Sequence, residues 1–165
     1  MDTNKKILKW FDKEKRSLPW RNSNKSSIDT YKVWISEIML QQTTVNAVIP
    51  YFKKFINRFP NIHSLAEGKL EEVLSNWAGL GYYSRARNIH KCAGIIVNQY
   101  NGVFPKKEIE LIKLPGIGDY TAAAICSIAY NQAAIAVDVN IERVISRIYN
   151  KHNAKKTEIK LLIRN

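Results

Sequence analysis

The chain is built around Leu114-Pro115-Gly116-Ile117-Gly118-Asp119-Tyr120, which runs into the alanine-rich stretch 121–125. Pro115 fixes its own φ, while Gly116 and Gly118 permit backbone angles that a Cβ would forbid. The alanines then favour a helix. Unpaired N–H groups at the start of such a helix, together with its dipole, favour an anion. The stretch predicts either a hairpin that binds a phosphate or a plain turn between two helices.

Two carboxylates accompany this stretch. Glu37 lies in the apolar run Val33-Trp-Ile-Ser-Glu-Ile-Met-Leu40. Burial there would raise the pKa of its carboxyl group and suit it to act as a general acid. The alternative is a Glu on the solvated stripe of a helix. Asp138 is well placed as a helix N-cap, and a capped carboxylate can face a pocket and stay ionised. Two such groups in unlike surroundings divide naturally into an acid and an anionic stabiliser.

The composition indicates a compact basic protein. The 165 residues suffice for one domain, and 45% of them are apolar, which argues against disorder. Lysine and arginine total 26 against 14 acidic residues, a net charge of +12 that suggests a polyanionic partner. An anionic membrane is the weaker alternative, since no basic amphipathic anchor or long apolar span is present. Met1 opens a polar segment, which indicates a cytoplasmic protein.

Cysteine and histidine usage predicts no metal site formed by side chains. Cys92 and Cys126 lie in apolar, helix-like contexts and are interpreted as buried reduced thiols. The three histidines show no mutual metal-ligand spacing.

Apolar residues recur at helical spacing along the chain, and no stretch alternates with period two. Asp29 or Thr30 is the expected N-cap of the second helix, and Pro60 is expected to end the third. The prediction is therefore an all-α protein of one compact body. The expected helices cover residues 3–14, 31–42, 45–58, 63–67, 69–76, 84–99, 106–113, 119–130, 139–150 and 155–164.

Two further groups could contact nucleic acid. Gln41 and Gln42 stand at a helix end and Thr43 follows them; the amides there could hydrogen-bond bases or simply cap the helix. Tyr82 and Tyr83 follow a glycine turn. In a basic protein, exposed rings there could wedge into or stack on bases; the alternative is two core tyrosines.

With these residues assembled, the chain resembles the helix-hairpin-helix DNA glycosylases, and within them the adenine DNA glycosylases. That family removes adenine mispaired with 8-oxoguanine or guanine. The matching stretches span nearly the whole chain and occur in the same order as in the family. The most specific of them are the Ser36–Thr43 and Gly79–Tyr83 runs. The matching stretches are Leu18-Pro-Trp-Arg21, Tyr31–Thr43, Val48–Phe52, Gly79–Arg87, Leu114–Gly118 and Val137–Asn140.

The resemblance implies a role for each matching residue. Glu37 would protonate the leaving adenine, Asp138 would stabilise the oxocarbenium-like sugar, and Tyr120 would lie beside them. Gln42 and Tyr82 would probe the base stack, with Gln41 and Thr43 also at the DNA. The hairpin 114–119 would grip a phosphate, with a monovalent cation bound at its backbone. The adenine pocket would be formed by Trp20, Arg21, Leu40 and Val45.

The resemblance also implies a reaction type. The base must be flipped out of the duplex before a protein acid can reach it. Related glycosylase/lyases carry a lysine where this chain has Tyr120, and a tyrosine cannot form a Schiff base. The expected enzyme is therefore a monofunctional hydrolase. Its expected partner is double-stranded DNA with an adenine mispair, bound by a monomer.

The chain departs from the family pattern in three places. Val139 replaces the usual glycine, and the loop 22–30 is longer than usual. The family's four-cysteine [4Fe-4S] segment and its 8-oxoguanine-reading domain are not contained in the 165 residues. One domain is expected, a six-helix core over about 30–136 with an N-terminal helix and the start of a second helical lobe. Such a C-terminally incomplete domain is expected to be unstable and weakly active. The rivals are a related glycosylase for another damaged base and an inactive DNA-binding remnant.

Overall fold

The computed structural model describes residues 3–21, 28–152 and 154–164. Within these ranges it contains ten α-helices and no strand, which confirms the all-α prediction. Each expected helix is present. The helices are α1 (Thr3–Glu14), α2 (Thr30–Leu40), α3 (Val45–Arg58), α4 (Ile62–Glu67), α5 (Leu70–Trp77), α6 (Tyr83–Tyr100), α7 (Glu108–Leu111), α8 (Asp119–Tyr130), α9 (Val139–Ile148) and α10 (Lys156–Arg164).

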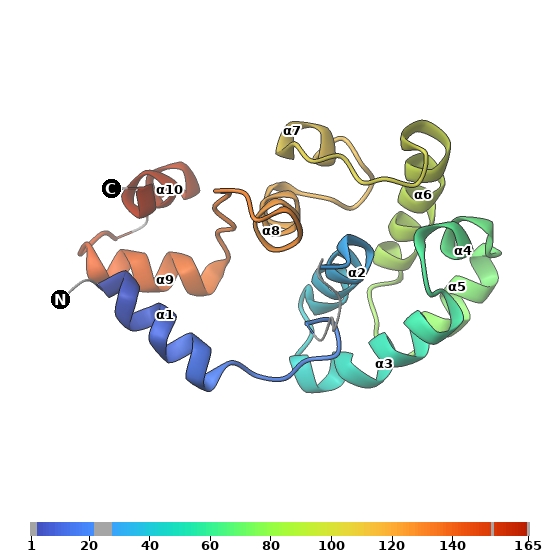
Figure 1. Ribbon diagram of the computed structural model, residues 1–165, viewed down its shortest axis with the longest axis horizontal. Helices are drawn as coiled ribbons and strands as arrows, with labels where there is room; N and C mark the ends of the chain where they lie inside the picture. Colours follow the sequence, from blue (N-terminus) through green and yellow to red (C-terminus); the bar gives the residue numbers. More distant parts are fainter. Residues whose placement is uncertain (1–2, 22–27, 153, 165) are drawn as a thin grey trace.

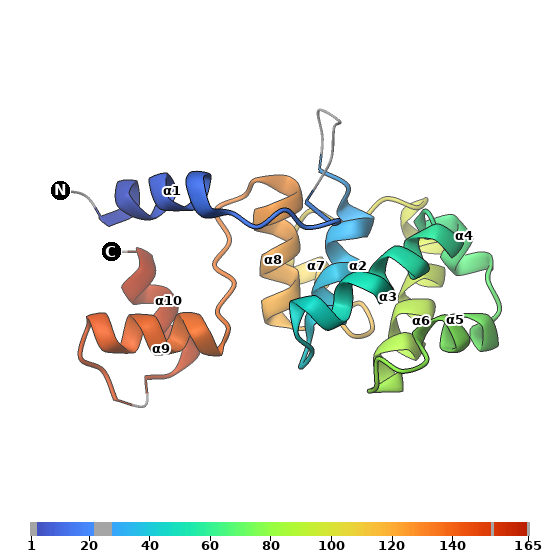
Figure 2. The same cartoon turned by 90° about the horizontal axis from the view of Figure 1, so that it is seen from below.

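The helices fall along one long axis of the molecule. At one end α3, α4, α5 and α6 lie together, and at the other end lie α1, α9 and α10 (Figure 1). Between them α2 packs against both α3 and α8. Figure 2 shows the same order from below, with α8 between α2 and the α9–α10 pair. None of the described helices is long and apolar enough to cross a membrane.

Large aromatic side chains fill the core between α2, α3, α5 and α6. Trp34, Phe55, Phe59 and Trp77 are fully buried. The ring of Phe55 meets the ring of Trp77 edge to face, with centroids 5.9 Å apart. Aromatic pairs in this geometry stabilise a core beyond the area that they bury. Most residues of α2 are buried, so this core fixes the position of the helix.

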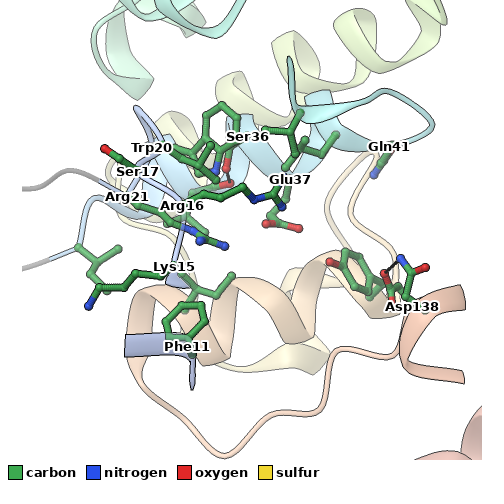
Figure 3. A pocket seen from close by; sticks show the side chains of 18 of the residues that line it. Phe11, Lys15, Arg16, Ser17, Trp20, Arg21, Ser36, Glu37, Gln41 and Asp138 are labelled. Atoms are coloured by element: carbon green, nitrogen blue, oxygen red, sulfur yellow. Dashed lines mark hydrogen bonds between the residues drawn. The ribbon is translucent and has the colours of Figure 1, made fainter. Parts of the chain in front are cut away.

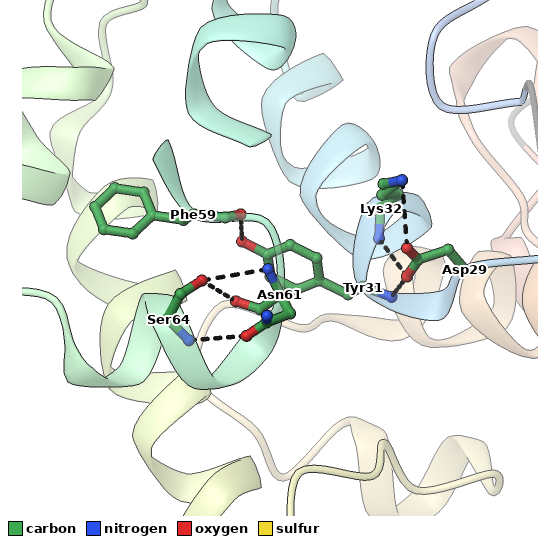
Figure 4. Close-up of polar contacts among 6 residues, drawn as sticks. All are labelled: Asp29, Tyr31, Lys32, Phe59, Asn61 and Ser64. Atoms are coloured by element: carbon green, nitrogen blue, oxygen red, sulfur yellow. Dashed lines mark hydrogen bonds and ion pairs between the residues drawn. The ribbon is translucent and has the colours of Figure 1, made fainter. Parts of the chain in front are cut away.

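Side-chain caps explain several helix boundaries. Asp29 accepts hydrogen bonds from the backbone N–H groups of Tyr31 and Lys32, so it is the predicted N-cap of α2. Asn61 and Ser64 form a reciprocal capping box at the start of α4 (Figure 4). The Tyr31 hydroxyl donates to the Phe59 carbonyl at 2.8 Å, which ties the start of α2 to the end of α3.

Some helix ends differ from the sequence prediction. The second helix ends at Leu40 instead of residue 42, because the backbone of Gln42 turns into the left-handed region at φ 58°. The predicted helix 106–113 shrinks to the single turn Glu108–Leu111. The helix predicted over 139–150 ends at Ile148.

One end of the molecule leaves apolar side chains in solvent. In α9 no residue is buried, and Val139, Val144 and Ile148 are each more than half exposed. Leu8 and Trp10 of α1 are each 63% exposed. The main helical neighbour of α9 is α10. This end is therefore held by fewer apolar contacts than the body formed by α2 to α8.

Candidate active site

A cavity of about 1260 Å³ is bounded by α2, α8, the start of α9 and the segment that follows α1 (Figure 3). It brings together nine of the residues singled out from the sequence, although they are spread over more than a hundred positions. These are Trp20, Arg21, Glu37, Leu40, Gln41, Gln42, Val45, Tyr120 and Asp138.

Glu37 reaches into the cavity from the last turn of α2 (Figure 3). It is half-buried, so the alternative of a fully solvated stripe does not hold. Burial raises the pKa of its carboxyl group, and the negative charge of Asp138 acts in the same direction. A hydrogen bond from the Tyr120 hydroxyl and the charge of Arg21 oppose this rise without cancelling it. Glu37 is thus disposed to hold a proton.

Asp138 faces the same cavity from the N-terminus of α9 (Figure 3). One carboxylate oxygen accepts from the Ile141 backbone N–H at 2.8 Å, and the other accepts from the Asn140 side-chain amide at 3.0 Å. Asp138 therefore caps α9 and also lines the cavity, so the helix-cap interpretation and the pocket interpretation of the sequence are both correct.

Tyr120 lies in the first turn of α8 and lines the cavity with the two carboxylates. Burial raises the pKa of its hydroxyl, as do the charges of Glu37 and Asp138. The neutral phenol can donate one hydrogen bond to a carboxylate. Tyr120 thus links the environments of Glu37 and Asp138.

The turn after α2 forms one rim of the cavity. Gln41 donates from its side-chain amide to the Thr121 hydroxyl at 3.4 Å, which connects α2 to α8. Gln42 is exposed and has a left-handed backbone. Thr43 does not line the cavity; its hydroxyl donates to the Gln41 carbonyl at 3.3 Å. The turn therefore offers one exposed amide at the edge of the site.

Tyr82 lies outside the cavity, at the turn before α6. Its side chain is 60% exposed and that of Tyr83 is 42% exposed, so the alternative of two core tyrosines is wrong. Tyr82 has a left-handed backbone, with φ 48°. Its ring is available to stack on another surface.

The hairpin 114–119 precedes Tyr120 and likewise does not line the cavity. Leu114 and Ile117 are buried and anchor it, while Gly116, Gly118 and Asp119 are exposed. Gly116 has φ 77°, and a Cβ there would lie 2.9 Å from the Asn88 Cβ. The expectation for Gly118 was wrong: φ is −92°, extended backbone that any residue adopts.

The two cysteines do not fit an iron–sulfur cluster. Cys92 and Cys126 are both buried, and a [4Fe-4S] cluster takes four thiolate ligands. Burial raises the pKa of the Cys92 thiol to about 12. The Cys126 thiol donates to the Lys106 carbonyl at 3.4 Å. Among the described residues, no group of three or more His, Cys, Asp or Glu side chains could hold a metal ion.

Comparison with known proteins agrees with this geometry. Residues 35–164 match the family model of the HhH-GPD superfamily base excision DNA repair proteins. The chain belongs to this superfamily. The helix-hairpin-helix assignment made from the sequence is thereby confirmed. The matched region contains Glu37, the hairpin and Asp138.

Several curated relatives are adenine DNA glycosylases. The chain is 49% identical over 157 residues to the one from Buchnera aphidicola subsp. Baizongia pistaciae, covering 94% of this chain and 44% of that protein. It is 46% identical over 147 residues to the one from Homo sapiens, covering 86% of this chain and 27% of that protein. The chain therefore spans less than half the length of these relatives.

Solved structures of similar fold are also DNA glycosylases or act on DNA. A thermostable thymine-DNA glycosylase superposes with a TM-score of 0.84 at 28% identity, covering 96% of this chain and 72% of that one. A trapped endonuclease III–DNA covalent intermediate gives a TM-score of 0.76 at 28% identity, covering 99% and 78%.

Sequence reasoning missed several residues that line the cavity. Ser36 lies on the same face of α2 as Leu40 and could have been found from their four-residue spacing. Phe11, Lys15 and Arg16 come from the N-terminal segment, which reaches the cavity from far along the chain. No local pattern signals such a tertiary contact.

Proposed function

We propose that this protein is a monofunctional DNA glycosylase that hydrolyses the N-glycosidic bond of adenine mispaired with 8-oxoguanine or guanine. One observation carries the proposal: Glu37 and Asp138 face one cavity from different helices and in different electrostatic surroundings. The identity of 49% to an adenine DNA glycosylase supports the choice of base.

Each wall of the cavity has a part in the proposed reaction. The target adenosine leaves the duplex and enters the cavity, because its base is inaccessible within the stack. Protonated Glu37 donates its proton to a ring nitrogen of adenine, and the bond between that base and C1′ of the sugar breaks. The Asp138 carboxylate stabilises the positive charge that develops on the sugar.

Water completes the proposed reaction. The carboxylate of Glu37, now deprotonated, accepts a proton from water as its oxygen attacks C1′. The products are free adenine and an abasic site, and Glu37 regains its proton. Tyr120 donates a hydrogen bond to Glu37 and forms no covalent bond to the sugar. Strand cleavage through a Schiff base therefore has no part in this scheme.

The proposed DNA contacts come from the hairpin 114–119 and from the turns that contain Gln42 and Tyr82. The first N–H groups of α8 have no partners within the helix, and a Cβ added at the neighbouring Gly118 would meet no atom within 4 Å. They suit a backbone phosphate. Backbone carbonyls of the hairpin are oxygen donors of the kind that monovalent cations prefer, and such a cation would add positive charge beside that phosphate.

One copy of the chain contains all the residues of this scheme, so a monomer on double-stranded DNA suffices. The proposal places the protein in the cytoplasm with the nucleoid. Neither an iron–sulfur cluster nor a reader of 8-oxoguanine enters the scheme for these 165 residues.

A single-turnover assay tests the proposal. Adenine release is measured from duplexes with adenine opposite 8-oxoguanine, guanine or thymine, for the parent and for Glu37→Gln. The amide keeps the shape of Glu37 but delivers no proton, so release from the two mispairs should fall at least about 10²-fold with DNA binding unchanged. Comparable rates for both proteins would refute the role of Glu37. Binding without release by the parent would instead indicate a DNA-binding remnant.

A further inference from the structure

Arg85 is a buried arginine at the centre of a backbone network. Its side chain is 8% exposed, although it carries a full positive charge. One terminal nitrogen, Nη1, donates to the carbonyls of Ile38 and Met39, both at 2.9 Å, and to that of Gln41 at 2.6 Å. These carbonyls close the C-terminal end of α2. A cation is favourable there because the helix dipole places partial negative charge at that end.

The other terminal nitrogen of Arg85 reaches a second turn. Nη2 donates to the carbonyls of Leu80 at 3.2 Å and Gly81 at 3.3 Å, and to the Thr43 hydroxyl at 3.5 Å. A single side chain thus bridges the turn 41–43 after α2 and the turn 79–82 before α6.

Both bridged turns contain a strained residue. Gln42 has φ 58° and Tyr82 has φ 48°, and neither is a glycine. Such conformations persist only where the surrounding structure holds them. Arg85 supplies such a constraint on both sides, and its guanidinium also lies 5.4 Å from the centroid of the Tyr82 ring.

We propose that Arg85 is a positioning residue that holds Gln42 and Tyr82 at a fixed separation for extrusion of the target nucleotide. The inference rests on the proposed function, because it concerns the step that delivers adenosine to Glu37. Glu37 lies in the last turn of α2, whose end Arg85 fixes. The same side chain therefore links the groups at the DNA with the acid.

The geometry requires arginine in particular. The planar guanidinium presents two terminal nitrogens: Nη1 donates to the turn after α2, and Nη2 donates to the turn before α6 and to Thr43. A lysine at this position has one nitrogen and can hold one turn only. Arg85→Lys keeps the charge and loses the bridge, whereas Arg85→Met loses both.

Fluorescence of 2-aminopurine placed beside the target adenine tests this inference. The base brightens when its stacking is disrupted, and the Glu37→Gln background keeps the adenine attached. At saturating protein, Arg85→Met should lower the fluorescence rise per folded molecule at least fivefold, and Arg85→Lys should give an intermediate value. Affinity for an undamaged duplex should change less than twofold. Lys91→Met, which removes a charge from an exposed position of the same helix, should keep the parental rise.

The outcomes separate this inference from the proposed function. No fluorescence rise with the protein that retains Arg85 would refute the proposed extrusion itself. A rise that is retained, per folded molecule, by Arg85→Lys and Arg85→Met would overturn the inference alone. If Arg85→Met does not fold, Arg85→Lys decides: a parental amplitude overturns the inference, and a reduced amplitude with parental duplex affinity supports it.

Discussion

Glu37 and Asp138 carry the same functional group, and their neighbours make them different. Glu37 is desolvated by burial and lies near a second negative charge, with the Tyr120 hydroxyl and Arg21 opposing both effects. Asp138, in contrast, accepts from two hydrogen-bond donors. Because burial penalises the charged form, the pKa of Glu37 rises above its ordinary value of 4.5. The proposed roles of the two groups, acid and anionic stabiliser, thus rest on the surroundings of the individual side chains.

The first prediction concerns pH. In the proposed mechanism base release requires protonated Glu37, so its rate should fall as the pH rises through the raised pKa of that carboxyl group. The free energy of unfolding should change in the same direction as the rate. The contribution of protonated Glu37 to stability is complete below the pKa that this group has in the unfolded chain, and it is lost as the pH rises through its higher pKa in the folded protein. Rates and urea unfolding measured from pH 4.5 to 8.5 check both. The difference in stability between the parent and Glu37→Gln should change with pH in this window; a constant difference contradicts the shift.

The second prediction separates the two roles of Asp138. Asparagine caps a helix about as well as aspartate, so Asp138→Asn should leave the stability of α9 nearly unchanged. It removes the charge that faces the sugar, and base release should fall about 10²–10³-fold, the range for losing one electrostatic stabiliser. Glu142→Gln is the control, since it removes an acidic charge from the same helix, where Glu142 pairs with Lys156 at 3.8 Å. If Asp138→Asn and Glu142→Gln release adenine at equal rates, Asp138 has no role beyond capping α9.

At the scale of elements, the hairpin between α7 and α8 allows a third prediction. Gly116→Ala should destabilise the fold by about 1–3 kcal/mol, because φ 77° is strained for alanine and its Cβ would crowd Asn88. Gly118→Ala should be nearly neutral for stability, since φ is −92° and the added methyl meets open space. If a phosphate occupies that space, Gly118→Ala should nevertheless weaken DNA binding.

Thermal unfolding and a DNA titration of both variants check this prediction. Gly118→Ala is the informative one, because its folded state is expected to match the parent. Parental affinity of this variant for duplex DNA would show that the hairpin is a plain turn between helices.

The helices themselves followed from the sequence, because apolar spacing and caps such as Asp29 act over a few residues. The end of α2 did not, since Gln42 adopts a left-handed backbone there and the carbonyls at the helix end accept from Arg85, more than forty positions away. Glu37 and Asp138 were found from their local surroundings, whereas Lys15 and Arg16 line the cavity only through tertiary folding. For Gly118 the sequence suggested a backbone conformation reserved for glycine that the structure does not have. A glycine in a turn does not by itself require a left-handed backbone.

At the scale of the whole molecule, the net charge of +12 supports a fourth prediction. DNA binding should be dominated by phosphates and should weaken steeply with salt, because each neutralised phosphate releases counterions. A plot of log affinity against log salt concentration should have a slope of about −0.9 per phosphate contacted. Titrations of one duplex from about 50 to 200 mM salt measure it. A flat plot would mean that the basic charge has no part in binding.

The last prediction concerns the distribution of stability along the molecule. The body from α2 to α8 has a continuous aromatic core, whereas α9 contains no buried residue and α1 exposes Leu8 and Trp10. Each exposed apolar side chain forgoes roughly 1.5–3 kcal/mol of burial free energy. Segments with few buried contacts open locally before the protein unfolds. Backbone amides of α1, α9 and α10 should therefore exchange hydrogen much faster than those of α2, α6 and α8.

This uneven stability bears directly on the proposed catalysis, because Asp138 caps α9 and Glu37 belongs to the largely buried α2. Each opening of α9 moves one carboxylate away from the other, and catalysis is sensitive to displacements on the order of 1 Å. Adenine release by these 165 residues should consequently be slow, and more so as temperature rises toward the opening of α9. Hydrogen exchange followed by mass spectrometry, with single-turnover rates at the same temperatures, checks the link. Equal protection of α9 and α2 together with fast release would contradict it.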